Sequence, residues 1–302
     1  MNNTNIKLDL MKPKLTKPIN KVQCLWLLLE GLMVCSPAVF SATASAVNGA
    51  TTTSQPSAEA AVTDPNLTDS SLSTSSVGAA GLVCAYMLGP RAGYGKVPFI
   101  PYNLVYTLVG ASLLWVGWFG FNARSAGAAD GRAGMAMLVT QVATALAALS
   151  WIIIEWFAKA RITMLGFASG AVAGLVAITP TSGFVNVSGP LMIGLAVGIC
   201  CYLGATSLKR LLGADDALDV FGIHGVGGIV GAILTGVFAN KAISGLDANV
   251  MVQTIAAFGT LIYNAVVTLI ILVIVDKLIG LRVEGEQEHD GLDLTQHAER
   301  VM

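Results

Sequence analysis

The stretch DVFGIHGVGGIVGAILTGVF, residues 219–238, is an apolar run of membrane-spanning length with one histidine near its start. A helix needs about 20 predominantly apolar residues to cross the hydrocarbon core of a bilayer. Because an ionisable side chain is costly at membrane depth, His224 predicts a polar pathway or a binding site. Glycines recur every third residue, and Gly227 and Gly231 form a small-xxx-small pair that lets a neighbouring helix approach closely. We therefore expect this helix to lie at the centre of a bundle.

The composition of the whole chain agrees with this interpretation. Hydrophobic residues make up 54% of the sequence and charged residues 12%, and the mean hydropathy is +0.71. These values lie outside the usual range of soluble proteins and predict an all-α polytopic membrane protein. The formal net charge is -1, and the basic residues are scattered between apolar runs instead of forming a stripe. Nucleic-acid binding is therefore excluded from the expected functions.

The first 76 residues contain two segments of different composition. Lysines precede an apolar core at residues 24–39, and small residues follow at 41–46, which is typical of a secretory signal peptide. We expect residues 1–46 to be a signal peptide, with an uncleaved signal anchor as the alternative because Glu30 interrupts the core. Residues 47–76 are rich in Ser, Thr, Ala and Pro. They cannot bury enough apolar area to offset the entropy of ordering and are expected to form a flexible linker.

The remaining sequence alternates apolar runs with short polar loops, which predicts a transmembrane domain at 77–279 and a polar tail at 280–302. The run at 77–88 has about a dozen residues and is too short to cross a bilayer, so it predicts half a helix. About six full spans are expected, at residues 102–122, 135–157, 163–178, 189–208, 219–238 and 250–275.

The distribution of basic residues predicts the orientation. If the last span ends inside, the inner loops carry most of the basic residues and the outer loops only a few, as the positive-inside rule requires. The C-terminus is then cytoplasmic, and the chain is a multi-pass protein of the cell (inner) membrane. The inner set is Arg91, Lys96, Lys159, Arg161, Lys209, Arg210, Lys277 and Arg282, and the outer set is Arg124, Arg132 and Lys241.

The sequence gives no independent support for an enzyme. Cys84, Cys200 and Cys201 lie in apolar runs without CxxC spacing, so neither a disulfide framework nor a zinc site is predicted. No pair of carboxylates has the surroundings of an acid–base site, and no metal-spaced histidine pair or GxSxG motif is found. We expect no catalytic residue, no bound metal and no cofactor.

Five segments carry a resemblance to a known family. They resemble the ammonium transporter (Amt/Rh) family in order and spacing over about two thirds of the chain. The resemblance implies an all-helical trimer in which each subunit encloses a narrow hydrophobic pore. Ammonium is recognised at the outer mouth of that pore, and ammonia passes a pair of hydrogen-bonded histidines. The segments are GWFGFNARSAG (117–127), WIIIEW (151–156), SGAVAGLVAITPTSGFV (169–185), LKRLLGADDALDVFGIHGVGGIVGAILTGVFA (208–239) and GLRVEGEQEHDGLDLTQH (280–297).

The resemblance assigns roles to four residues. Trp118 and Phe121 match the aromatic walls of the outer recruitment site, and Ser125 matches the hydroxyl that accepts a hydrogen bond from the cation. Aromatic faces attract cations, by roughly 2 kcal/mol when the contact is desolvated; the alternative is an interfacial belt of aromatic residues. His224 matches the second histidine of the pore pair. A neutral imidazole offers one donor and one acceptor, which suits a relay along a dry pore, and the alternative is a structural histidine bonded to a carbonyl.

The acidic residues near the inner helix ends are assigned structural roles. Asp219 matches a family acidic residue and is expected at the helix N-terminus, where a negative charge interacts favourably with the helix dipole. Asp215 and Asp216 are expected to be solvated residues at the helix start. Glu155 is expected to pair with Lys159 or to extend toward the interface.

The chain also departs from the family pattern. The family is built from two inverted five-helix repeats, and most of the first repeat is missing from this sequence. The place of the first pore histidine falls near Thr74, in the predicted linker, so the histidine pair is expected to be incomplete. Arg124 stands beside Ser125, and its fixed positive charge would oppose a cation.

Two functions therefore remain open. The first is ammonium or ammonia transport, channel-like and impaired by the loss of the first repeat, with homo-trimers or mixed trimers. The alternative is a non-conducting membrane protein or a deletion remnant, which binds a regulator or mixes with full-length subunits. The tail resembles the part of the family that docks a PII-type nitrogen regulator, and its alternating charge is typical of a folded contact surface. A merely solvated tail is the other reading.

Overall fold

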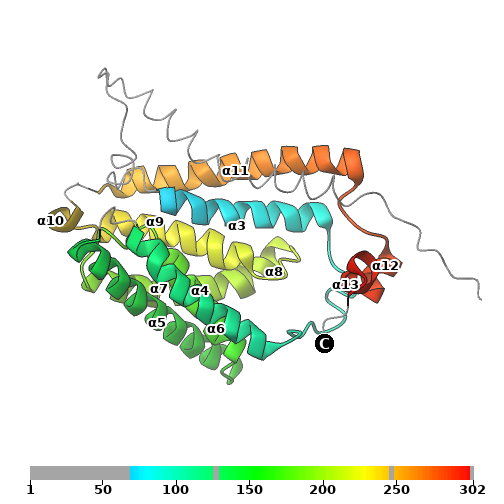
Figure 1. Cartoon of the computed structure of the whole chain (residues 1–302), viewed down its shortest axis with the longest axis horizontal. Helices are drawn as coiled ribbons and strands as arrows, with labels where there is room; N and C mark the ends of the chain where they lie inside the picture. Colours follow the sequence, from blue (N-terminus) through cyan, green and yellow to red (C-terminus); the bar gives the residue numbers. More distant parts are fainter. Residues whose placement is uncertain (1–68, 125–128, 245–247, 300–302) are drawn as a thin grey trace, which may run out of the picture. The chain divides into compact units, whose positions relative to one another are not determined.

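Within residues 69–124, 129–244 and 248–299, which are the residues that the computed structural model describes, all regular structure is helical (Figure 1). This confirms the predicted all-α class. The predicted signal peptide and most of the predicted linker lie outside the described residues. The longer elements are α3 (Asp69–Leu88), α4 (Leu104–Arg124), α5 (Gly131–Lys159), α6 (Met164–Ile178), α7 (Ser188–Leu203), α9 (Val226–Phe238) and α11 (Val250–Ile279). The shorter elements are η1 (Gly204–Leu208), α8 (Lys209–Leu212), η2 (Phe221–Gly225), α10 (Lys241–Ser244), α12 (Gly285–Asp290) and α13 (Leu292–His297).

Five helices of the described residues are long and apolar enough to cross a membrane. They are α4, α5, α7 with its continuation through α8, η2 with α9, and α11. Each occupies one of the six predicted full spans.

The sixth predicted span, at residues 163–178, differs in length. It corresponds to α6, which has 15 residues and is therefore about 22 Å long, shorter than the roughly 30 Å hydrocarbon core. Beyond Ile178 the chain continues as buried turns, in which Thr181 N donates to Ile178 O and Phe184 N donates to Thr181 O. Irregular backbone at this depth is tolerated because protein surrounds it.

Helix α3 is longer than the sequence predicted. Half a helix was expected at residues 77–88 after a flexible linker, whereas the helix begins at Asp69 and has 20 residues. Its hydroxyl-rich start is stabilised by tertiary packing, because Thr74 and Ser75 are buried and lie against Gly228 of α9. Composition alone does not reveal such packing, so the predicted end of the linker was wrong by several residues.

Side-chain caps fix the beginnings of three helices. Asp130 accepts hydrogen bonds from the backbone of the first turn of α5, Thr163 accepts from Gly166 N, and Asn249 accepts from the first turn of α11. These oxygens satisfy backbone N–H groups that have no partner within the helix. Helix α5 ends at Ala160, whose φ of 53° turns the chain sharply toward α6.

Helix α9 contacts α3, α6, α7 and α11 and lies between the α3–α11 pair and the other long helices (Figure 1). Its glycines make these contacts close. A Cβ atom at Gly227 would lie 3.2 Å from Cys201 Sγ, and one at Gly228 would lie 2.8 Å from Ser75 N. The prediction that this helix is central to a bundle is confirmed.

Replacing Gly78 of α3 with alanine should lower the stability of the fold. A Cβ atom there would lie 3.1 Å from the carbonyl carbon of His224 and closer still to the backbone of Gly225. Overpacking of this kind costs about 1–3 kcal/mol. Thermal unfolding of the detergent-solubilised protein would measure the loss.

The matched control is Gly259→Ala in α11, where a Cβ atom meets nothing within 4 Å. That change should be neutral or stabilise the helix by up to about 1 kcal/mol, because alanine has the higher helix propensity. Equal unfolding temperatures for the two variants would contradict the close packing of α3 on η2.

The loops at one end of the helices are fastened to one another. The Arg282 guanidinium donates to Leu88 O and Pro90 O, each at 2.9 Å, and forms an ion pair with Glu288 at 2.8 Å. Arg91 forms an ion pair with Asp215 at 2.6 Å. The tail is thus held against the α3–α4 loop, and that loop is held against the segment before η2. We call this end of the bundle the tail end.

Candidate functional site

His224 lies in the π-helical turn η2, which begins the central span, and its side chain is half-buried. The carboxylate of Asp216 caps this turn by accepting hydrogen bonds from Val220 N at 2.9 Å and Phe221 N at 2.8 Å. Single π-helical turns within α-helices occur frequently at functional sites. The turn therefore places a polar ring at a defined position in an otherwise apolar span.

Helix α3 packs directly on this turn. Gly78 approaches the backbone of His224 and Gly225, and Thr74 and Ser75 pack on Gly228, one turn farther along. The place of the first pore histidine, near Thr74, was expected to fall in a linker. Thr74 instead lies in helix α3, beside the span that carries His224. A hydroxyl can donate and accept a hydrogen bond, as an imidazole can. The site combines one imidazole with the hydroxyl groups of a neighbouring helix.

The aspartates before η2 differ in part from their predicted roles. Asp215 and Asp216 do stand at the helix start, but both are buried, with exposures of 9% and 6%, so the prediction that they are solvated is wrong. Hydrogen bonds from the Arg91 guanidinium hold the pKa of Asp215 below its usual value. Burial is tolerated because Asp215 is paired with Arg91 and Asp216 is bonded to the helix start.

Asp219 lies at the helix start, as predicted, but its carboxylate does not cap the helix. It pairs with Lys209 at 2.7 Å, and its backbone has a φ of 54°, in the left-handed region. The cap comes from Asp216, three residues earlier, because the chain turns at Asp219 before the π-helical turn begins. The acidic residue that satisfies the backbone N–H groups at the start of η2 is therefore Asp216.

Trp118 and Phe121 lie on α4, toward the end opposite the tail end. Their rings are 5.7 Å apart in an edge-to-face arrangement, and Trp118 Nε1 donates to Thr179 Oγ1 at 2.8 Å. Trp118 also packs against the buried core, which favours a place inside the bundle over an interfacial belt. Phe121 is 48% exposed beside an apolar groove of about 590 Å³ along α4. Ser125 lies outside the described residues.

Asn122 is a polar residue near this aromatic pair that the sequence analysis did not single out. It is fully buried, its Nδ2 donates to Thr140 Oγ1 at 2.9 Å, and its Oδ1 has no hydrogen-bond partner among the residues that the structure describes. An unsatisfied buried acceptor is costly in an apolar interior. An amide within the apolar GWFGFN string was the signal that could have identified it.

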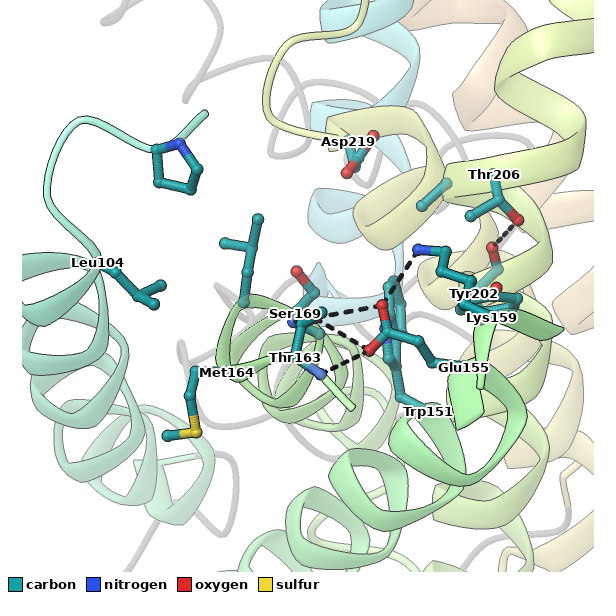
Figure 2. A pocket seen from close by; sticks show the side chains of 14 residues that line it. Leu104, Trp151, Glu155, Lys159, Thr163, Met164, Ser169, Tyr202, Thr206 and Asp219 are labelled. Atoms are coloured by element: carbon teal, nitrogen blue, oxygen red, sulfur yellow. Dashed lines mark hydrogen bonds and ion pairs between the residues drawn. The ribbon is translucent and has the colours of Figure 1, made fainter. Parts of the chain in front are cut away.

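A cavity of about 380 Å³ opens at the tail end, between the starts of α4 and α6 and the ends of α5 and α7 (Figure 2). Glu155 lies in its wall and is almost fully buried; it accepts hydrogen bonds from Lys159 and from the hydroxyl and backbone N–H of Thr163. The predicted pairing of Glu155 with Lys159 is confirmed. Asp219, Thr206 and Ser169 add further polar groups to the wall, and Trp151 and Tyr202 add aromatic ones.

The described residues contain no group of three or more His, Cys, Asp and Glu residues that could hold a metal ion. The cysteines of this part of the chain are free, and Cys201 is buried. What the arrangement offers is a half-buried imidazole, hydroxyl groups on the facing helix and an aromatic pair toward the opposite end.

Three comparisons with known proteins agree with one another. The model of the Ammonium Transporter Family matches residues 69–302. The chain is 46% identical to the ammonium transporter of Aquifex aeolicus, over 74% of this chain and 54% of that protein. It is 43% identical to the ammonium transporter of Bacillus subtilis, over 75% of this chain and 58% of that protein.

Solved structures show the same likeness. The crystal structure of Saccharomyces cerevisiae Mep2 aligns with a TM-score of 0.64 and 35% identity, covering 70% of this chain and 51% of that one. A structure described as a sensor Amt protein aligns with a TM-score of 0.69 and 26% identity, covering 78% of this chain and 59% of that one. The chain spans a little over half the length of the curated relatives it matches.

Proposed function

Since the chain belongs to the ammonium transporter family, whose members are transporters and not enzymes, we propose that it takes part in moving ammonium or ammonia across the cell membrane. The observation that carries the proposal is the position of His224, in a π-helical turn of the central span with α3 packed against it. A neutral imidazole can accept a hydrogen bond from ammonia and donate one onward. In a dry pore it replaces the hydration that the molecule loses.

Trp118, Phe121 and Ser125 are the proposed recruitment residues at the outer mouth. The edge-to-face ring pair leaves aromatic surface that can attract a cation, and the Trp118–Thr179 hydrogen bond holds the indole in place. Asn122 Oδ1, a buried acceptor next to Phe121 that has no partner in the described part of the chain, is a further group proposed to receive an N–H bond from the substrate. The tail end, with its many basic residues, is then cytoplasmic.

A complete pore of this family requires more helices than this chain describes, because the chain spans little more than half of each relative. In a homo-trimer or in a mixed trimer with longer subunits, helices of neighbouring subunits would supply further wall. Helix α4 supports such packing, since none of its membrane-length window is buried within the chain and a Cβ atom at Gly110, Gly117 or Gly120 would meet nothing within 4 Å.

Co-expression tests this function. Cells that lack every other ammonium transporter would receive this chain together with a polypeptide that carries the first five spans of a relative. We expect methylammonium uptake that requires both polypeptides. Uptake equal to that of cells with the five-span polypeptide alone would overturn the proposal.

A second function is favoured by the fastening of the tail. Arg282 and Glu288 hold the tail against the α3–α4 loop, and Arg91 of that loop pairs with Asp215, next to the Asp216 cap of the His224 turn. A regulator of the PII type that docked on α12 and α13 would therefore contact a segment connected to the candidate pore. This supports the alternative of a chain that binds a regulator, whether or not it conducts.

Membranes that bear the full chain should retain a PII protein weakly and in a nucleotide-sensitive manner. Truncation after Gly280 removes α12 and α13 and should abolish retention, whereas truncation after His297 keeps both helices and serves as the matched control. Co-sedimentation of PII with the three membrane preparations measures the difference. Equal retention by the full chain and the chain truncated after Gly280 would mean that the tail is merely solvated.

A further inference from the structure

The cavity at the tail end has both charged and apolar walls. Its volume, about 380 Å³, falls within the range of roughly 300–1,000 Å³ that is usual for ligand sites. At the rim of the cavity, Lys159 supplies an ammonium group and Asp219 supplies a carboxylate. These two opposite charges attract each other electrostatically. A ligand that fits must therefore satisfy both signs of charge.

The carboxylate of Asp219 has capacity for a second donor. Lys209 bonds its Oδ1 at 2.7 Å, and about a third of the side chain is exposed. Glu155 is different, because both of its oxygens already accept bonds from Lys159 or Thr163 and its side chain is only 4% exposed. The carboxylate available to a ligand is thus that of Asp219, and the rings of Trp151 and Tyr202 lie in the same wall (Figure 2).

The remaining wall is apolar and open. Leu104, Met164 and Leu165 line it and are 39%, 52% and 42% exposed. Leu104 begins α4 and Met164 begins α6, so this wall lies where membrane helices start, at the boundary between acyl chains and headgroups. Apolar side chains exposed at this depth face lipid, and a ligand held here can leave its own apolar part in the bilayer.

From these walls we infer that the cavity binds the headgroup of a zwitterionic aminophospholipid, a phosphoethanolamine. Its phosphate lies against the ammonium of Lys159, and its primary ammonium donates to Asp219 and faces the Trp151 and Tyr202 rings. Its acyl chains leave past Leu104, Met164 and Leu165. A quaternary choline headgroup cannot donate a hydrogen bond to Asp219, and a glycerol headgroup carries no charge to neutralise it.

Native mass spectrometry of the full chain, titrated with lipids of identical acyl chains, tests the inference. Phosphatidylethanolamine should be retained at one molecule per chain and about tenfold more tightly than phosphatidylcholine or phosphatidylglycerol, the effect of one charge-assisted hydrogen bond. Successive N-methylation of the headgroup should weaken retention stepwise. Equal retention of ethanolamine and choline lipids, or tighter retention of phosphatidylglycerol, would overturn the inference.

Two pairs of variants locate the binding. Thr206→Leu places bulk in the cavity and should remove the preference for ethanolamine, whereas Ser207→Leu, at the adjacent exposed position outside the cavity, should keep it. Asp219→Asn should make ethanolamine and choline lipids equivalent, and Asp276→Asn, at the end of α11, should not. Identical behaviour within either pair would place the lipid elsewhere. If Thr206→Leu does not fold, the headgroup series on the unmodified chain decides.

Discussion

Replacing His224 with alanine should abolish most of the methylammonium uptake of any assembly in which this chain conducts. The histidine lies half-buried in the first turn of the central span, where ammonia would have shed its water. Leaving one polar group without a hydrogen bond in a protein interior costs about 1–3 kcal/mol, so uptake should fall about tenfold to a hundredfold. Radiolabelled methylammonium uptake at equal surface expression is the measurement.

Two substitutions separate a relay role from a structural one. His224→Gln keeps a donor and an acceptor on a side chain of similar length and should retain part of the uptake. Ile223→Ala, at the buried neighbouring position, should lower stability and leave the uptake of each folded assembly near that of the parent. Parental uptake by His224→Ala would show that the histidine is structural.

Cells that lack every other ammonium transporter and express this chain alone should take up methylammonium at close to the background rate. In the architecture that the family resemblance implies, the pore is enclosed between two repeats, and this chain matches about half of each relative. Among the described residues, His224 is the only histidine that lies in a candidate span, because His289 and His297 lie in the tail helices. Uptake comparable with that of an intact family member would contradict this expectation and would require two copies of the chain to enclose a pore.

The long apolar helices could be predicted from the sequence because burial in a bilayer imposes a length and a composition on each of them. The five spans of sufficient length lie where apolar runs indicated them. Helix α6 was predicted as a full span at residues 163–178 and lies within those bounds, but its 15 residues are too few to cross the hydrocarbon core, and the chain continues beyond Ile178 as buried turns. Hydropathy detects burial, and it does not distinguish a helix from a turn that protein surrounds.

The beginning of α3 could not be predicted from composition. Thr74 and Ser75 are hydroxyl residues in a Ser-rich stretch, which alone indicates disorder. They are helical because a long-range contact with Gly228 buries them. Gly228 lies about 150 positions after Ser75 in the sequence. A local sequence pattern cannot reveal a contact between residues so far apart.

The candidate site was predictable in its residue types more than in its geometry. The histidine and the aromatic pair were evident as polar or aromatic groups in apolar strings. Asp216 caps the helix and Asp219 pairs with Lys209 because the backbone at Asp219 is in the left-handed region. The sequence pattern does not predict that backbone conformation. The cavity at the tail end arises from five elements, which are the start of α4, the end of α5, the start of α6, the α7–η1 segment and the turn at Asp219, and it has no local sequence signature.

The pairing of α3 with α11 and the tail has a consequence for biosynthesis. Arg282 bonds Leu88 across 194 residues, and Asn264 donates to Ser76 across 188 residues. While the ribosome is still extending the chain, α3 therefore has neither of these partners. Thr74 and Ser75 can pack on Gly228 once α9 has been translated, whereas Ser76 gains its α11 partner only after the last span has been translated.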